Sequence, residues 1–522
     1  MRAAASGLSC RTTLAVVGLV ALVLLCTSCR RTEPLPSDAV VVVVEAAPRS
    51  IDPRFATSDY DAKLSRLVFA ALVQTDTADG EPTLDLAASV VPESPTRYVV
   101  TVRDDARFHD GAPVTSADVV YTYGSLADVG SPYAGNLDGV TVAALDDRTV
   151  AFTLDEPFAP FLLELDLGIV PQHLLAETGT FGDRDPVGAG PWRFVRTDAD
   201  GTTLLEAFDE GHAPPTHLRH VAFRVVPDDT TRLLALLAGS VDLAQNATPQ
   251  TLLPVVARDP ELVIETSPSF KYSYIVFNLD VPPLDDIHVR RAIALGIDRE
   301  EIIAHRLGGA ATLSTGLLPP HHWAWSAARS WPYDPAAAIA ELDAGGYAPD
   351  AEGCRVRIEY KTSANRFYRG IAALIAAQLG EIGVCIDLQS WEWGTFFGDV
   401  KSGNFEMASL QWTSVVDPDL FAWIFHSENI PTAENTSAGG NRGRYRNDRV
   451  DALLDEGART LDRDARRAIY AEVQQILADE LPYVSLWHED NVVVRRATLE
   501  GYTPVPTARF AGLVNARWAT AR

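Results

Sequence analysis

The chain has 522 residues, of which 47% are hydrophobic, and a formal net charge of -26. This length exceeds what a single hydrophobic core supports and predicts two or three domains. The strong negative charge excludes nucleic acid as a partner, because a surface that repels phosphate gains nothing from counterion release. It also argues against a general affinity for anionic lipid.

The N-terminus predicts export. An apolar run from Leu14 to Leu25 follows basic residues and is shorter than the roughly twenty residues of a membrane-spanning helix, which is typical of a signal peptide. The run from Cys26 to Cys29 resembles a lipobox, although Cys26 stands where Leu, Val or Ile is usual. We predict a signal peptide over 1–28, lipidation of Cys29 and a stiff tether over 29–37, with an unanchored periplasmic protein as the alternative.

The first predicted element of the mature chain is a strand from Val40 to Val44. Its uninterrupted β-branched residues are typical of a strand buried on both faces. The irregular loop that follows contains Arg49 and Ser50. Loops at the carboxyl ends of strands line the crevice of open α/β sheets, so these two residues are candidate ligand contacts.

The segment Arg107–Tyr123, RFHDGAPVTSADVVYTY, combines a turn with the start of a helix. Asp110-Gly111 predicts the turn, and Thr115 with Asp118 predicts a capping box. This run resembles the signature of the family 5 solute-binding proteins, extracytoplasmic receptors for peptides, nickel and related solutes that feed ABC importers. In that family the signature lies in an accessory subdomain and does not form the ligand site.

A second glycine motif, Gly188-Ala189-Gly190, is followed by Pro191 and Trp192. A phosphate-binding loop needs a helix N-terminus at that point, so a dinucleotide site is excluded. The segment resembles the family's GTGPY-type turn, where the chain re-enters the first lobe. A strand over 218–226 and a helix over 229–237 follow it.

The second half of the chain alternates between predicted strands and helices. Strands are expected at 270–279, 355–360, 384–388, 407–411, 483–486 and 491–495, and helices at 286–296, 298–303, 368–379 and around 450–454 and 469–477. Asp298 and Glu301 predict a capping box for the second helix. The order strand, helix, strand over 355–388 predicts a parallel unit. Cys354 and Cys385 flank this unit, and in an oxidising compartment they predict a disulfide, with two buried thiols as the alternative.

The resemblance covers nearly all of the chain after residue 38, with the motifs in family order. It implies an α/β protein of the periplasmic-binding-protein type II fold, with two α/β lobes joined by a hinge and an inserted accessory α+β subdomain. The implied boundaries are 38–56, 185–268 and 489–522 for lobe I, 57–184 for the accessory subdomain and 269–488 for lobe II.

Three tryptophans follow predicted strands of lobe II. Trp391 and Trp393 come after one strand and Trp412 after another, so the indoles are expected to face one crevice at the carboxyl ends of the strands. Core packing is the alternative for each of them. Tyr272, Tyr274 and Asn278, on the strand that enters lobe II, are further candidates, with cross-strand packing as the alternative.

The loop Asn441–Tyr445, NRGRY, is a candidate for binding a ligand carboxylate through Arg444 or Arg442, or else a solvated loop. Peptide-binding relatives carry an Asp three residues after a Trp, and its carboxylate holds the ligand's α-amine. Here Val415 stands at that place, or Ser414 if the alignment shifts by one. A free amine would therefore need another partner, which leaves a blocked or cyclic peptide, an oligosaccharide or a metal chelate as candidate ligands.

Motifs for catalysis or metal binding are absent from the sequence. The histidines lack the helical spacing of a metal site, and neither HExxH nor GxSxG occurs. We therefore predict no enzyme activity, no metal and no cofactor. The predicted function is a monomeric, lipid-anchored, periplasmic or cell-surface binding protein that delivers a peptide or similar solute to an ABC permease. A secreted hydrolase with similar lobes and a solute sensor for a signalling partner are the alternatives.

Overall fold

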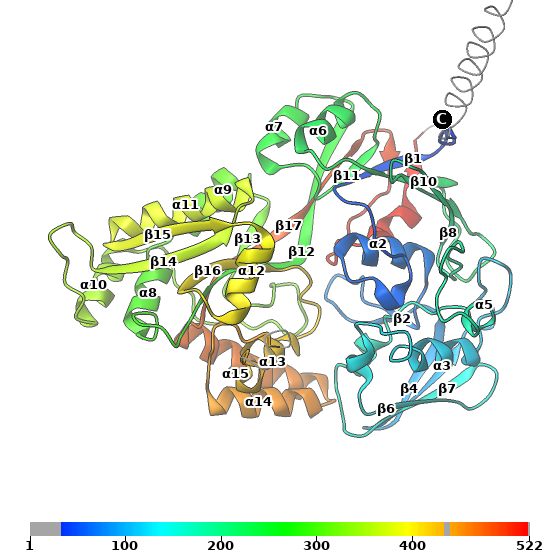
Figure 1. Cartoon of the computed structure of the whole chain (residues 1–522), viewed down its shortest axis with the longest axis horizontal. Helices are drawn as coiled ribbons and strands as arrows, with labels where there is room; N and C mark the ends of the chain where they lie inside the picture. The colour runs from blue at the N-terminus through cyan, green and yellow to red at the C-terminus, as the bar shows by residue number, and fades with distance from the viewer. Residues whose placement is uncertain (1–32, 433–438, 520–522) are drawn as a thin grey trace, which may run out of the picture.

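The computed structural model describes residues 33–432 and 439–519. Within them the chain forms two α/β lobes, joined by the long strands β12 (Leu262–Phe277) and β17 (Tyr483–Arg496) (Figure 1). The predicted signal peptide and Cys29 lie outside the described residues. Among the residues described, no helix combines the length and the apolar character that crossing a membrane requires.

An eleven-stranded sheet runs through both lobes of the described chain. Its order is β15-β14-β16-β12-β17-β11-β1-β10-β9-β8, and β13 pairs with β17 off this path. The other strands are β1 (Val40–Val44), β8 (Trp192–Thr197), β9 (Thr203–Ala207), β10 (His220–Val225), β11 (Leu243–Gln245), β13 (Ala311–Leu313), β14 (Val356–Ser363), β15 (Val384–Trp391) and β16 (Met407–Trp412). Lobe I carries β1 and β8 to β11, and lobe II carries β13 to β16.

Strands β12 and β17 cross from one lobe to the other as an antiparallel pair. The pairing runs from Leu262 to Ser267, breaks, and resumes at Lys271, which lies opposite Glu489. The prediction of two separate strands near the C-terminus is wrong, because β17 is continuous. The polar residues between the two predicted apolar segments pair with β12 and β13, so their side chains interrupt the apolar pattern but not the strand.

Strand β1 lies between β10 and β11 and is parallel to both. Its valines alternate between two cores, one that includes α2 (Asp59–Val68) and one that includes α6 (Asp229–Leu237). This double burial explains the uninterrupted β-branched run and confirms the sequence prediction. The helix α7 (Leu253–Val256) completes the second core.

In lobe II, β14 is parallel to both β15 and β16, so the carboxyl ends of these three strands share one edge. This confirms the predicted parallel unit. One face of the sheet packs on α8 (Ile287–Leu295), α9 (Arg299–Arg306), α10 (Pro335–Ala344) and α11 (Arg366–Glu381). The other packs on α12 (Trp393–Ser402), α13 (Leu420–Phe425), α14 (Asp448–Arg459) and α15 (Arg463–Glu480).

A disulfide joins Cys354 to Cys385, as the sequence predicts, with the two Cα atoms 5.8 Å apart. It connects the residues just before β14 to β15. Asp350 and Glu352 lie close enough to the Cys354 sulfur to suggest a metal site. Because that sulfur is in the disulfide, it is not a thiolate that could bind a metal.

A smaller four-stranded sheet lies below lobe I in Figure 1. Its order is β4 (Ala87–Ser94), β5 (Arg97–Val102), β7 (Thr149–Leu154) and β6 (Val140–Ala144), and it packs against α3 (Ser116–Gly124). The predicted capping box of Thr115 and Asp118 is present. Short elements complete this region and the C-terminus: β2 (Val73–Gln74), β3 (Thr83–Leu84), α4 (Phe161–Glu164), α5 (Gln172–Leu175), β18 (Leu499–Glu500) and β19 (Arg517–Trp518).

The glycine turn before β8 lies against the end of α2. A Cβ atom on Gly190 would approach the Leu67 carbonyl oxygen to 2.4 Å, and one on Gly188 would approach the Val68 carbonyl oxygen to 2.0 Å. These glycines therefore permit close backbone packing rather than phosphate binding. Strand β8 follows the turn, so no helix begins there, as Pro191 and Trp192 predict. The strand itself was not predicted.

Candidate ligand-binding site

The carboxyl edge of the lobe II sheet brings the predicted tryptophans into one region. Trp391 ends β15, Trp412 ends β16, and Trp393 begins α12, which lies on the side of lobe II toward lobe I (Figure 1). The side chains of Trp391 and Trp393 are 44% and 56% exposed, whereas Trp412 is partly buried. Two of the three indoles are therefore open to contact with a solute.

A continuous stack, which we call the aromatic stack, consists of Trp393, Phe397, Arg442, Trp412 and Tyr274. The Trp393 and Phe397 rings are 5.3 Å apart and nearly parallel. The Arg442 guanidinium carbon lies 4.8 Å from the Phe397 ring and 4.9 Å from the Trp412 ring. The Trp412 and Tyr274 rings are 6.5 Å apart. The stack thus extends from the exposed surface of α12 to the centre of the sheet.

Arg442 gives this edge a positive charge. No carboxylate of the described residues lies within ion-pair distance of it, and its charge is instead held by the faces of two rings, each contact contributing about 1 kcal/mol. Its Nε atom and the Nε1 atom of Trp412 are buried and have no hydrogen-bond acceptor within the described chain. A buried donor without an acceptor destabilises the folded protein. Such donors are typical of a site where a ligand or a water molecule supplies the acceptor.

A polar cluster, which we call the hinge network, lies where β12 meets β17. It consists of Lys271, Ser273, Tyr368, Gln411 and Glu489. Lys271 Nζ donates to Glu489 Oε2 at 2.6 Å, and Ser273 Oγ donates to Glu489 Oε1 at 3.1 Å. Gln411 Nε2 donates to Ser273 Oγ and to Glu489, while the Tyr368 hydroxyl donates to Gln411 Oε1 at 2.9 Å. Burial disfavours the charged form of Lys271, but the attraction of the Glu489 carboxylate is stronger than this effect. The pKa of Lys271 is therefore raised.

Tyr272, Tyr274 and Asn278 are buried and have partners within lobe II. The Tyr272 hydroxyl shares a hydrogen bond of 2.7 Å with Ser485 Oγ, and the Tyr274 ring lies 4.4 Å from the Tyr483 ring. The Asn278 side chain donates to the carbonyl oxygens of Gly403 and Phe405. The structure therefore places Tyr272 and Tyr274 at or near the carboxyl end of β16, beside Trp412, whereas Asn278 lies at the opposite end of that strand, next to Glu406, and away from the indoles.

The NRGRY loop presents its two arginines differently. The Arg444 guanidinium donates to the carbonyl oxygens of Arg442 and Ser402, at 3.0 and 3.2 Å, and lies 3.6 Å from the Asp280 carboxylate. Arg442 instead reaches the aromatic stack. The sequence could identify the loop but not which arginine lies beside Trp412, because that depends on how the loop folds back on the sheet.

Arg49 and Ser50 lie in lobe I, on the loop after β1. The Arg49 side chain is exposed, and its backbone N–H donates to Asp61 Oδ1 at 2.6 Å. Glu45, the residue after β1, lies within electrostatic range of Lys271 in the hinge network. Burial raises the pKa of Glu45, while Arg232 and Lys271 act in the opposite direction. Charged groups of both lobes therefore influence one another near the crossing strands.

A side pocket of about 260 Å³ lies between α2, the end of α3 and the segment from α4 to Gly168. Phe69 and several leucines form its apolar part, and Arg66, Asp166 and Arg509 form an ion-pair chain at its wall. Sequence analysis did not identify this pocket, because these three residues are widely separated along the chain and belong to no motif. Its volume is slightly below the roughly 300–1,000 Å³ that is usual for ligand sites.

A family model for bacterial extracellular solute-binding proteins, family 5, matches residues 81–431. A probable D,D-dipeptide-binding periplasmic protein of Escherichia coli K12 is 25% identical over 486 residues, which cover 90% of this chain and 92% of the relative. A substrate-binding protein of an ABC transporter from Listeria monocytogenes is 26% identical, with a TM-score of 0.82 and coverage of 92% and 99%.

The solved complex of a Campylobacter jejuni protein with Ni(L-His) is 23% identical, with a TM-score of 0.78 and coverage of 92% and 100%. This likeness confirms the predicted two-lobed fold. Members of the matching family are periplasmic or extracellular proteins. The chain belongs to family 5 of the bacterial extracellular solute-binding proteins, a family of binding proteins rather than enzymes.

Proposed function

We propose that this protein captures a small solute between its two lobes and delivers it to the permease of an ABC importer. The observation that carries the proposal is the aromatic stack, which presents the exposed indole of Trp393 and, among the described residues, an arginine charge without a carboxylate partner on the side of lobe II toward lobe I. The ligand would favour the closed state, because only there does it contact both lobes. Family membership supports the permease as partner, and excludes a hydrolase as the alternative.

We propose Trp391, Trp393 and Trp412 as the ligand contacts of lobe II, and Arg49 and Ser50 as those of lobe I. Tyr272 and Tyr274 would position these contacts rather than touch the ligand, because both are buried and lie near Trp412. Asn278 and Arg444 would instead stabilise lobe II, because they bond to carbonyl oxygens of residues 402–405 before the start of β16. We also propose the domain boundaries that the sequence analysis predicts for the two lobes and the accessory subdomain.

The ligand that we propose is a peptide-like solute whose binding does not depend on a free α-amine. The place of the amine-binding Asp in peptide-binding relatives is taken here by Val415, which is fully buried. The nearby carboxylate of Glu489 already accepts hydrogen bonds from Lys271 and two other side chains. Arg442 favours a ligand with a carboxylate near the stack. A blocked or cyclic peptide fits these conditions best, and an oligosaccharide or a metal chelate would need other partners.

Native purification followed by mass spectrometry of the molecules released on unfolding would identify the ligand class. A thermal-shift titration of the recovered ligand then tests the site. Loss of an indole at such a site costs on the order of 2 kcal/mol, so Trp412→Ala should weaken binding roughly thirty-fold. Trp518→Ala is the control, because this partly buried indole lies at the C-terminal end of lobe I. Equal affinities of the two variants would refute the proposed site.

We further propose that the protein is a monomer anchored to a bacterial membrane through lipidated Cys29. The lipobox-like sequence and the extracytoplasmic location of the family support this. Expressed with its signal peptide, the wild-type protein should fractionate with membranes, and Cys29→Ala should leave a soluble protein. A role as a sensor is the remaining alternative. Loss of solute uptake on deletion of the gene would favour transport, whereas intact uptake with an altered transcriptional response would favour sensing.

A further inference from the structure

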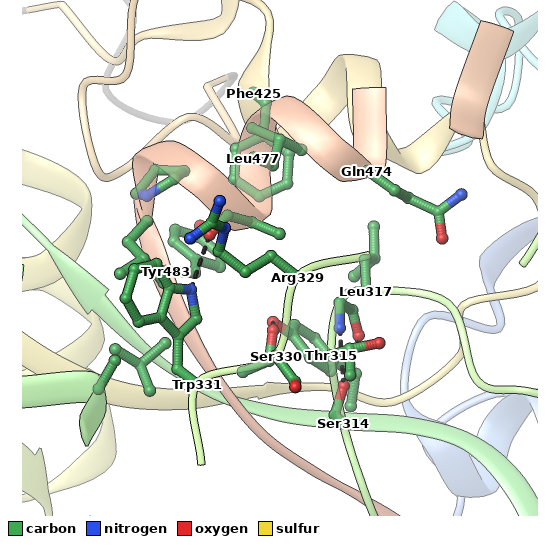
Figure 2. Close-up of a pocket in the computed structure, with 18 of the residues that line it drawn as sticks. Ser314, Thr315, Leu317, Arg329, Ser330, Trp331, Phe425, Gln474, Leu477 and Tyr483 are labelled. Atoms are coloured by element: carbon green, nitrogen blue, oxygen red, sulfur yellow. Dashed lines mark hydrogen bonds between the residues drawn. The ribbon is translucent and has the colours of Figure 1, made fainter. Parts of the chain in front are cut away.

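A small cavity inside lobe II lies behind the buried end of the aromatic stack, since two residues of its wall, Tyr272 and Tyr483, stack on Tyr274. The proposed function does not use this cavity. Its volume is about 40 Å³. Figure 2 shows its wall, which comes from the loop after β13, the segment that contains Arg329 and Trp331, helix α15 and the start of β17. A cavity needs roughly 10–15 Å³ to hold one water molecule, so this one can hold a small ion.

The lining of the cavity is positively charged. It contains Arg299 and Arg329 and no aspartate or glutamate. The charge of Arg329 is compensated, because its Nε atom lies 2.5 Å from the Asp479 carboxylate. Its guanidinium also lies over the Trp331 ring, and Figure 2 shows the two side chains next to each other. For Arg299, in contrast, no carboxylate within the described ranges lies at ion-pair distance. The cavity therefore has one uncompensated charge, in a chain whose net charge is -26.

Arg299 is buried, with 6% of its surface exposed. Its guanidinium donates to the carbonyl oxygens of Ser485, at 2.9 Å, and of Trp331. A guanidinium has five N–H donors, so these two bonds leave donors available. Burial also lowers the pKa of Arg299, to about 10. An isolated buried charge is costly unless a counterion or further hydrogen bonds compensate it.

We propose that this cavity binds a monatomic anion of the size of chloride, which neutralises Arg299 and stabilises lobe II. The volume admits such an ion and is too small for a peptide or a sugar. The hydroxyl groups of Thr315 and Ser330, which also line the cavity, are suitable donors to a halide. The site is independent of the solute that the two lobes are proposed to capture.

The test is a thermal-shift titration with sodium chloride or bromide at constant ionic strength, with sodium gluconate as the balancing salt. The wild-type protein should show a saturating rise in Tm of about 2 °C, because an anion that binds only the folded state stabilises it by mass action. Arg299→Gln should lose this rise. Arg466→Gln should retain it, because Arg466 is an equally buried arginine of lobe II that pairs with Asp417 instead.

Crystals of the wild-type protein soaked in sodium bromide provide a second measurement, which does not require Arg299→Gln to fold. An anomalous difference peak inside the cavity would support the proposal. A well-ordered water molecule at that position, with no anomalous signal, would overturn it. So would a halide-dependent rise in Tm that is equal in the wild-type and Arg299→Gln proteins.

Discussion

Arg442 is the residue that connects the exposed and buried halves of the aromatic stack. Its guanidinium lies between the Phe397 and Trp412 rings, at 4.8 and 4.9 Å. Arg442→Gln removes both cation–π contacts and the positive charge, so we expect roughly ten-fold weaker binding of an anionic ligand. Isothermal titration calorimetry with the ligand recovered from the native protein would measure this loss.

The matched control comes from the same loop. Arg444→Gln removes a guanidinium that donates to backbone carbonyls and approaches Asp280, so it should lower thermal stability while leaving affinity nearly unchanged. If instead Arg444→Gln weakened binding and Arg442→Gln did not, the direct ligand contact would be Arg444, which the sequence alone made an equally good candidate.

The residue before α13, Asp419, should make the thermal stability of the protein depend on pH. Burial, together with the neighbouring carboxylates of Asp417 and Glu164, raises the pKa of Asp419 to about 6. A carboxyl group whose pKa is higher in the folded state contributes stability that is present below about pH 3.8 and is lost as the pH rises through 6. Asp419→Asn should therefore have a Tm a few degrees above wild type at pH 7.5 and no advantage at pH 4.

Differential scanning calorimetry of both proteins between pH 4 and 8 would measure that difference. A difference in Tm that stays constant over this range would contradict the prediction, because it would show that the variant acts through packing rather than through the ionisation of Asp419.

Individual site residues were only partly predictable from the sequence. The indoles were identified because a tryptophan directly after a parallel strand lies at the carboxyl edge of the sheet, regardless of the conformation of the loops. The sequence could not distinguish exposed Trp393 from buried Tyr274, since burial depends on what packs against each ring. The partners of the hinge network, such as Lys271 and Glu489, are 218 positions apart and share no motif.

At the scale of elements, the disulfide between Cys354 and Cys385 constrains the β14–α11–β15 unit. The cysteines are 31 positions apart, and closing a loop of that length stabilises a protein by roughly 3–4 kcal/mol in the chain-entropy account. Replacing both cysteines by serine should therefore lower the Tm of lobe II by several degrees. Dithiothreitol should destabilise the wild-type protein and leave the double variant unaffected, and a wild-type Tm that is insensitive to reductant would argue against the bond.

Elements were predicted well where their signals are local. Helix α6 begins and ends where the periodic pattern places it, and β1 follows from its valine run. Tertiary contacts overrode local signals elsewhere. Asp298 caps α9 by accepting from the Glu301 backbone N–H, but the Glu301 carboxylate accepts from Gln378 instead of completing the predicted box. The continuity of β17 depends on strand partners more than 170 positions away, which no local pattern reveals.

At the scale of the whole molecule, helices α14 and α15 of lobe II contact the segment 81–159, which contains the four-stranded sheet. Arg463, at the start of α15, lies 2.7 Å from the Glu81 carboxylate, and the Ala159 N–H donates to the Ala458 carbonyl oxygen at 2.7 Å. Arg463→Glu replaces an attraction with repulsion, so the two halves should separate further and bind the ligand several-fold more weakly. Small-angle scattering and calorimetry would measure the two effects.

Arg449→Glu is the control for this variant, because Arg449 is an exposed arginine of the same lobe that pairs with Glu472 within lobe II. An unchanged radius of gyration and affinity in Arg463→Glu would show that the contact does not restrain the lobes. The length predicted two or three domains, and the two-lobed plan itself followed from the family resemblance. The contacts between the halves were not, since they join surface residues with no common pattern.

The exposed indoles of Trp391 and Trp393 have a practical consequence. Indole emission shifts to shorter wavelength when water leaves the ring, and both rings are about half exposed in the described structure. A solute that covered them would change the intrinsic fluorescence of the protein. The emission wavelength of the protein would then show whether the site is occupied. Candidate solutes could be screened by this wavelength without any attached dye.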